Sequence, residues 1–246
     1  ASDYTPASLL AGAKAVLFDL DGTLRRLSPT DHEALLERVT HIGHTIEPSA
    51  QAAGVLWSHA YWADSARSNR DMNELDDASF WRNYLYYYLK AMKLADHQLH
   101  PISNQISEHF VEEFKPHGYL TPGAKELLTA LKQAGRQVGL ISNRHRPLAH
   151  AVDELGIAEY FDFTLAAGEI DIWKPDPRIF HAALDIAGGV APEKAVYIGD
   201  NYYADVVGAT QAGMSAILID EHGAYEHGSY RCPTIRHFNE LISALQ

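Results

Sequence analysis

The chain has 246 residues, of which 46% are hydrophobic and 21% charged, and its formal net charge is −12 at pH 7. This length and composition predict a soluble globular protein with one sizeable α/β domain, or a core domain carrying a smaller inserted one. The acidic balance argues against nucleic acid or an anionic membrane surface as the main partner, but it is compatible with a small phosphorylated ligand.

Cysteine and hydropathy patterns narrow the class further. The single cysteine, Cys232, excludes an intramolecular disulfide and any cysteine-rich metal site. Residues 1–10 lack the basic and apolar segments of a signal peptide, and no apolar run is long enough to span a membrane. We therefore expect a cytoplasmic protein.

The first strong signal along the chain is the apolar run from Ala15 to Phe18, which predicts a buried parallel strand. Two carboxylates one residue apart, Asp19 and Asp21, follow at once, and Gly22 comes next. Ligands of open α/β sheets bind at the carboxyl ends of strands, and carboxylates this close repel each other unless a cation or a proton lies between them. The pair therefore suggests a cation site, although Asp-Gly alone is common in ordinary turns.

The block that follows, residues 25–116, predicts an all-helical insertion. Apolar residues at helical spacing predict helices over residues 31–43, 48–62, 76–94 and 102–114, and nothing between Leu24 and Pro116 shows the alternation of a strand. The polar, basic stretch Ser65–Arg70 is expected to connect two of these helices. The aromatic residues of this block, among them Tyr84 and Tyr88 on one helical face, are expected to form the core of a helical bundle.

From Thr121 onward short apolar strands alternate with helices. Strands are expected over residues 137–141, 161–166, 195–198 and 215–219, and helices over residues 122–135, 147–156, 175–187 and 203–212. Such alternation predicts right-handed crossovers and a parallel sheet. The expected organisation is an α/β core formed by residues 1–24 and 117–246, with the helical block of residues 25–116 inserted after the first strand.

Several later segments carry groups suited to phosphate and metal. Ser142 and Asn143 follow a strand and offer a hydroxyl and backbone N–H groups at a turn into a helix. Lys174 precedes a proline-rich loop that would aim its ammonium, whereas Asp200 follows another strand with Asp205 nearby. Taken alone, Ser142 and Lys174 read as an ordinary turn residue and a surface lysine. Carboxylates without histidine or cysteine favour Mg²⁺ over zinc.

Together these segments resemble the four motifs of the haloacid dehalogenase superfamily. In chain order the motifs are Asp19-x-Asp21-Gly22-Thr23, Ser142, Lys174-Pro175 and Gly199-Asp200-x₄-Asp205. The resemblance extends from about Ala15 to Ile219. It implies a Rossmann-like parallel core whose helical insertion is a cap that selects the substrate.

The resemblance also implies the reaction. Asp19 would attack phosphorus and form an aspartyl-phosphate, and Asp21 would act as general acid and base. Mg²⁺ would be held by the side chains of Asp19 and Asp200 and by the backbone carbonyl of Asp21. The spacing of four residues before Asp205, where three is commoner, leaves open whether Asp205 contacts the metal or a coordinated water.

Phosphate binding would fall to Ser142, Asn143 and Lys174, while the hydroxyl of Thr23 would support the loop. Four residues next to these motifs lie near the mouth of the site on chain position alone, although each is expected to be a solvated surface residue: Arg25, Arg26, Arg144 and His145.

The presence of Asp21 favours phosphate-ester chemistry, because the dehalogenases of this superfamily lack that aspartate. We therefore expect a Mg²⁺-dependent phosphatase that acts on a small phosphorylated metabolite. A phosphomutase of the same superfamily and a catalytically silent binding protein are the alternatives. The sequence carries no signal for the identity of the substrate or for the oligomeric state.

Overall fold

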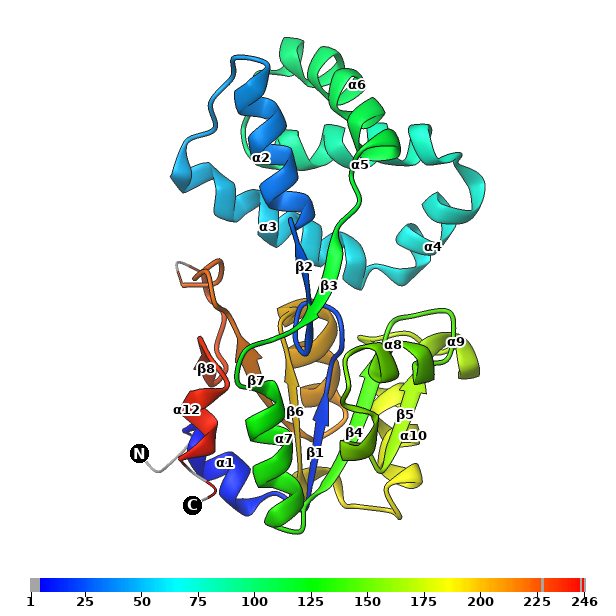
Figure 1. Ribbon diagram of the computed structural model, residues 1–246, viewed down its shortest axis with the longest axis vertical. Coiled ribbons are helices and arrows are strands. Elements are labelled where there is room, and N and C mark those ends of the chain that lie inside the picture. The colour runs from blue at the N-terminus through cyan, green and yellow to red at the C-terminus, as the bar shows by residue number, and fades with distance from the viewer. Residues whose placement is uncertain (1–4, 227, 244, 246) are drawn as a thin grey trace. The chain divides into compact units, whose positions relative to one another are not determined.

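The computed structural model describes residues 5–226, 228–243 and 245, which form two compact units (Figure 1). Within the described residues, the first unit runs to Arg26 and continues over Tyr119–Gly223 and from Gly228. The second unit consists of Leu27–Gly118 and a short segment that begins at Ala224.

The first unit is built on a six-stranded sheet with the order β5-β4-β1-β6-β7-β8, and every neighbouring pair of strands is parallel. The strands are β1 (Ala15–Phe18), β4 (Gln137–Ser142), β5 (Phe163–Ala166), β6 (Ala195–Gly199), β7 (Ser215–Ile219) and β8 (Thr234–Ile235). β1 lies between β4 and β6, and Phe18 is in register with Leu140 and Ile198. The carboxyl ends of these three strands therefore meet at one edge, and the predicted parallel α/β fold is confirmed.

Helices cover both faces of this sheet. They are α1 (Pro6–Gly12), α7 (Ala124–Gln133), α8 (Ala149–Glu154), α9 (Ala167–Ile170), α10 (Pro177–Ile186), α11 (Val207–Gln211) and α12 (Asn239–Ile242). α7 buries Leu127, Leu128 and Leu131, which share one helical face, in a cluster with Val16 of β1. The opposite face of the sheet carries Tyr197 of β6. The centroid of its ring lies 5.0 Å from that of Phe180 of α10.

The second unit contains α2 (Asp31–His41), α3 (Pro48–Ala63), α4 (Ser65–Glu74), α5 (Asp77–Ala91) and α6 (Asp96–Glu112). Its core is aromatic, as expected, with Tyr84 and Tyr88 buried. The buried hydroxyl of Tyr84 donates to Asp31 (2.9 Å) and lies 2.6 Å from the hydroxyl of Ser58, so it keeps hydrogen-bond partners. Among the described residues, no helix combines the length and apolar character needed to cross a membrane.

Three details of the insertion differ from the sequence-based expectation. β2 (Arg25–Ser28) pairs with β3 (His117–Leu120) in a small sheet, so the prediction of no strand between Leu24 and Pro116 was wrong. These four-residue strands are polar and lack alternation, so periodicity does not reveal them. Ser65–Arg70 is part of α4 rather than a connector, and Asp64 caps that helix by accepting from the N–H of Arg67. α6 begins at Asp96, six residues before the expected start, and continues through Pro101.

Candidate active site

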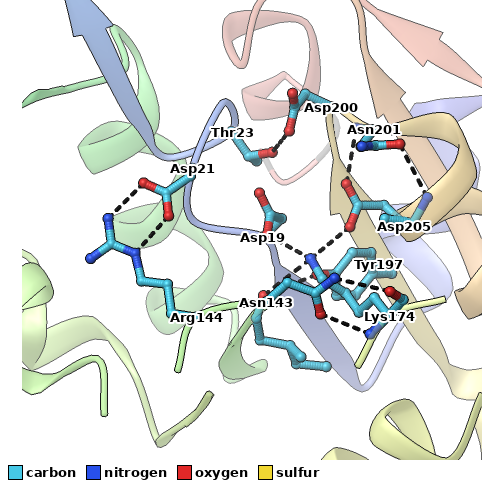
Figure 2. Close-up of polar contacts among 12 residues, drawn as sticks. Asp19, Asp21, Thr23, Asn143, Arg144, Lys174, Tyr197, Asp200, Asn201 and Asp205 are labelled. Carbon is cyan, nitrogen blue, oxygen red and sulfur yellow. Dashed lines mark hydrogen bonds and ion pairs between the residues drawn. The ribbon is translucent and has the colours of Figure 1, made fainter. Parts of the chain in front are cut away.

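Segments far apart in the sequence bring polar side chains together at the carboxyl edge of the sheet (Figure 2). Asp19 follows β1, Asn143 follows β4 and Asp200 follows β6, three strands that are neighbours in the sheet. Lys174 comes from the loop between α9 and α10. The parallel order of the sheet therefore places these motifs at one edge.

Lys174 is the centre of a buried polar network. Its Nζ lies 2.6 Å from Oδ1 of Asp19, 2.7 Å from Oδ1 of Asp205 and 3.0 Å from the hydroxyl of Tyr197. Burial lowers the pKa of Lys174, but the two carboxylates outweigh burial and hold the pKa well above its usual value. The ammonium is therefore charged and fixes one oxygen of Asp19.

The carboxylates around Lys174 form an acidic cluster. One oxygen from each of Asp19, Asp200 and Asp205 lies within 4.8 Å of the others. Burial and the charges of Asp205 and Asp200 raise the pKa of Asp19 well above its ordinary value, and burial together with Asp205 raises the pKa of Asp200 to about 7. The ammonium of Lys174 can balance only one of these three carboxyl groups, so the group carries an excess of negative charge when all three are ionised.

This excess fits a divalent cation with oxygen ligands, such as Mg²⁺. The turn after Asp21 is shaped around the same carboxylates: a Cβ added at Gly22 would lie 2.3 Å from Oδ2 of Asp200. Gly22 also has φ +89°, a conformation that favours glycine. The main chain beside Asp21 consequently packs directly against Asp200, where its carbonyl groups can complete an oxygen donor set. Without sulfur or imidazole ligands, the cluster is unsuited to zinc.

The unusual spacing before Asp205 has a local structural explanation. Tyr202–Val206 forms one turn of π-helix, in which the N–H of Val207 bonds to the carbonyl of Tyr202. A π turn accommodates one residue more than an α-helical turn, so the extra residue is absorbed before α11 begins. Asp205 is buried, accepts from the N–H of Asn201 at 3.0 Å and still reaches Lys174.

The side chain of Asp21 turns away from this cluster. Nε and Nη2 of Arg144 donate to its two oxygens at 2.6 and 2.7 Å, and Nη1 of Arg25 donates to Oδ1 at 2.9 Å. Figure 2 shows this fork-shaped pair beside the loop that carries Thr23. Arg144 is partly exposed, as expected of a surface residue, but its guanidinium is held by a carboxylate, a contact that was not predicted. The partner of an arginine cannot be recognised from its position in the sequence.

The predicted phosphate-binding residues have distinct surroundings. The side-chain amide of Asn143 is engaged by the backbone of Lys174: Nδ2 donates to its carbonyl at 2.9 Å, and Oδ1 accepts from its N–H at 2.7 Å. Ser142 is buried at the end of β4. The hydroxyl of Thr23 donates to Oδ1 of Asp200 at 3.1 Å, while its carbonyl accepts from Thr121.

Sequence reasoning missed one contributor to the site and the pairing of another. Tyr197 lies inside β6, and its hydroxyl accepts from Lys174 and donates to the carbonyl of Ile141 at 3.2 Å. A tyrosine in an otherwise apolar strand was the available signal, because a buried hydroxyl needs a partner. Arg144 was expected near the mouth of the site, but its pairing with Asp21 was not predicted.

Comparison with known proteins identifies the family. The model of the haloacid dehalogenase-like hydrolases matches residues 13–213. The chain belongs to this family. The resemblance inferred from the motifs is thereby confirmed.

Individual relatives differ in the reaction that their names describe. The haloacid dehalogenase-like hydrolase domain-containing protein 3 of Bos taurus is 30% identical over 210 residues, 84% of this chain and 81% of the bovine protein. The ribulose-1,5-bisphosphate 5-phosphatase of Halopiger xanaduensis is 28% identical over 244 residues, covering 95% and 96% of the two chains. The structure of a 2-haloacid dehalogenase from Pseudomonas syringae has a TM-score of 0.54 and 26% identity, covering 95% and 98% of the chains.

Proposed function

We propose that this hydrolase is a Mg²⁺-dependent phosphatase that cleaves a small phosphate monoester through an aspartyl-phosphate on Asp19. The observation that carries the proposal is the convergence of Asp19, Lys174 and the acidic cluster at the sheet edge, with a second aspartate, Asp21, two residues from the first. The phosphatase named among the relatives supports the same chemistry.

In the first half-reaction, a carboxylate oxygen of Asp19 attacks phosphorus, and the bond from phosphorus to the ester oxygen breaks. Asp21 gives a proton to that leaving oxygen. In the second half-reaction, water attacks the aspartyl-phosphate, Asp21 accepts the proton of that water, and the bond to Asp19 breaks to release phosphate. Lys174 orients Asp19 by holding Oδ1 at 2.6 Å, which leaves Oδ2 to attack.

We assign the cation to the side chains of Asp19 and Asp200 and the backbone carbonyl of Asp21. Bound Mg²⁺ supplies positive charge that offsets the charge of the phosphoryl oxygens. Asp205 is assigned two roles. It accepts a hydrogen bond from the ammonium of Lys174 at 2.7 Å, and it lies in the outer part of the cation site. This assignment balances the excess negative charge of the cluster.

The phosphoryl oxygens are assigned to the hydroxyl of Ser142, the backbone N–H of Asn143 and the ammonium of Lys174. The three donors of this ammonium lie on Asp19, Asp205 and Tyr197, so one of these contacts must be exchanged for a phosphoryl oxygen. The side chain of Asn143 is better suited to another task, because both of its polar atoms already hold the backbone of Lys174. We further propose that residues 25–116 act as a cap that selects the substrate.

Dehalogenation is the competing chemistry, since one structural relative is a dehalogenase. The dehalogenases of the superfamily lack the second aspartate of the first motif, because a departing halide needs no proton. This chain has Asp21, whose carboxylate is ordered by two arginines. The proton-transfer group that an ester needs is therefore present, and we favour phosphate-ester cleavage.

The test is turnover of a panel of phosphate esters and 2-haloacids by the purified chain with Mg²⁺. We expect phosphate release that is lost in Asp19→Asn and retained in the control Asp185→Asn, which changes an exposed aspartate of α10. Halide release without phosphate release, or full phosphatase activity in Asp19→Asn, would contradict the proposal.

A further inference from the structure

Asp21 is held by more positive charge than it can neutralise. Arg144 and Arg25 both donate to its carboxylate, so two guanidinium groups share one directly bonded carboxylate, and Asp19 and Glu154 act on Arg144 only at longer range. The side chains of Asp21 and Arg144 are 41% and 34% exposed, so the pair is accessible to solvent and to a ligand. Such a cluster attracts an additional anion.

The same pair restricts the role proposed for Asp21. Arg144 occupies both carboxylate oxygens, through Nε to Oδ2 and Nη2 to Oδ1. A carboxyl group that carries a proton cannot accept at both oxygens in this two-bond geometry. Asp21 must therefore be released from at least one bond before it gives a proton to a leaving group. Arg25 donates to Oδ1 and not to Oδ2, so it can keep the carboxylate in place when Oδ2 is released.

The backbone of Arg144 is fixed, so its side chain is the part that can move. The carbonyl of Arg144 accepts from the N–H of Gly168 at 3.0 Å. A Cβ at Gly168 would lie 2.2 Å from the carbonyl oxygen of His145, so the two segments are in close backbone contact. A long, partly exposed guanidinium on a fixed backbone can exchange one anionic partner for another without rearrangement of the fold.

We propose that Arg144 is a substrate-binding residue that exchanges Asp21 for a second anionic group on the substrate, a carboxylate or a second phosphate. A guanidinium fork binds either group with two parallel hydrogen bonds, as it binds Asp21. Engagement of this group frees Oδ2 of Asp21 for proton transfer. The substrate class is therefore phosphate monoesters that carry a second anionic group. This inference rests on the proposed phosphatase function.

The experiment compares substrate pairs that differ in the second anion. One pair is 3-phosphoglycerate and glycerol 3-phosphate, and the other is fructose 1,6-bisphosphate and fructose 6-phosphate; together they separate a carboxylate from a phosphate. kcat/KM is measured for wild type, Arg144→Gln, Arg144→Lys and the control Arg146→Gln, which removes a nearby exposed arginine. Circular dichroism confirms that each variant is folded.

We expect wild type to prefer the anion-bearing member of at least one pair. Arg144→Gln should reduce that preference about 10- to 100-fold, the range typical of a lost charge-assisted hydrogen-bonding pair. Arg144→Lys keeps the charge but loses the fork, so the reduction should be smaller. Arg146→Gln should retain the wild-type preference. An equal loss for both members of each pair in Arg144→Gln, or an equal shift in Arg146→Gln, would overturn the inference.

Failure of the phosphatase proposal itself has a separate signature. If wild type cleaves none of the four esters, calorimetric titration with the same compounds decides the inference. Tighter binding of the anion-bearing members that is lost in Arg144→Gln supports the site. Absence of that preference in wild type overturns it.

Discussion

Lys174→Met tests the electrostatics of the site most sharply. The substitution removes the ammonium that lies 2.6 Å from Asp19 and 2.7 Å from Asp205 while keeping an unbranched apolar side chain. Removing one partner of a buried ion pair costs about 3–5 kcal/mol, because a buried charge is left uncompensated. For a chain of 246 residues, about 2–4 °C of Tm corresponds to each kcal/mol, so Tm should fall by about 6–20 °C in EDTA.

Mg²⁺ should act in the opposite direction. Without the ammonium, the carboxylates of Asp19, Asp200 and Asp205 attract a divalent cation more strongly than they do in wild type. Because a ligand that binds the folded state stabilises it in proportion to its affinity, Mg²⁺ should raise the Tm of Lys174→Met more than that of wild type. Catalysis should nevertheless be lost, since the group that orients Asp19 is absent.

The assay is thermal unfolding followed by circular dichroism, in EDTA and in millimolar MgCl₂. Lys90→Met, which changes an exposed lysine of α5, is the matched control and should unfold like wild type. A Tm for Lys174→Met within about 2 °C of wild type in EDTA would contradict a stabilising ion-pair role for Lys174, since loss of a buried ion-pair partner predicts a larger shift. A Mg²⁺ response smaller than that of wild type would refute it as well.

Two further substitutions test single contacts. Asn143→Ala removes both hydrogen bonds to the backbone of Lys174, so the free energy of unfolding measured in urea should fall by about 1–3 kcal/mol, and phosphatase activity should fall as well. Asn143→Asp keeps the acceptor and should lose less stability and activity. Equal losses in the two variants would contradict this role for Asn143. Burial raises the pKa of Asp162, but hydrogen bonds from Lys132 and the N–H of Val138 outweigh burial and lower it below 3.8. Its contribution to stability is therefore present above about pH 4 and lost as the pH falls through the lowered pKa. The deficit of Asp162→Asn in urea unfolding should be at most about 1 kcal/mol at pH 7 and should shrink as the pH is lowered below about 4, and a deficit that does not change with pH would contradict it.

The parallel core was predictable because its signals are local and repeated. The apolar run before Asp19 and that before Asp200 each define a buried strand, and the sheet order places β1 beside β6 as the acidic residues require. β2 and β3 were missed because each strand has only four residues and neither shows an alternation of buried and exposed positions. α4 was missed because its sequence is polar and carries no apolar stripe; its buried residues are Ser68 and Asp71.

Side-chain partners were less predictable than positions. Asn143 follows β4 as expected, but a side-chain amide can bind a phosphate or a backbone equally well. Only the fold brings the carbonyl oxygen of Lys174 within 2.9 Å of Nδ2 of Asn143. The fork between Arg144 and Asp21 joins residues 123 positions apart, a separation that no local pattern encodes. The spacing before Asp205 was a visible signal, and its resolution as a π turn required the structure.

Direct detection of a phosphoryl group on Asp19 tests the central claim. Asp21→Asn is mixed with p-nitrophenyl phosphate and Mg²⁺, quenched in acid and mapped by mass spectrometry. A good leaving group needs little acid assistance, whereas hydrolysis of the intermediate needs a base, so the aspartyl-phosphate should accumulate. We predict one phosphoryl group on Asp19 in Asp21→Asn and none in Asp19→Asn. A phosphoryl group on another residue, or ester cleavage by Asp19→Asn at the wild-type rate, would contradict it.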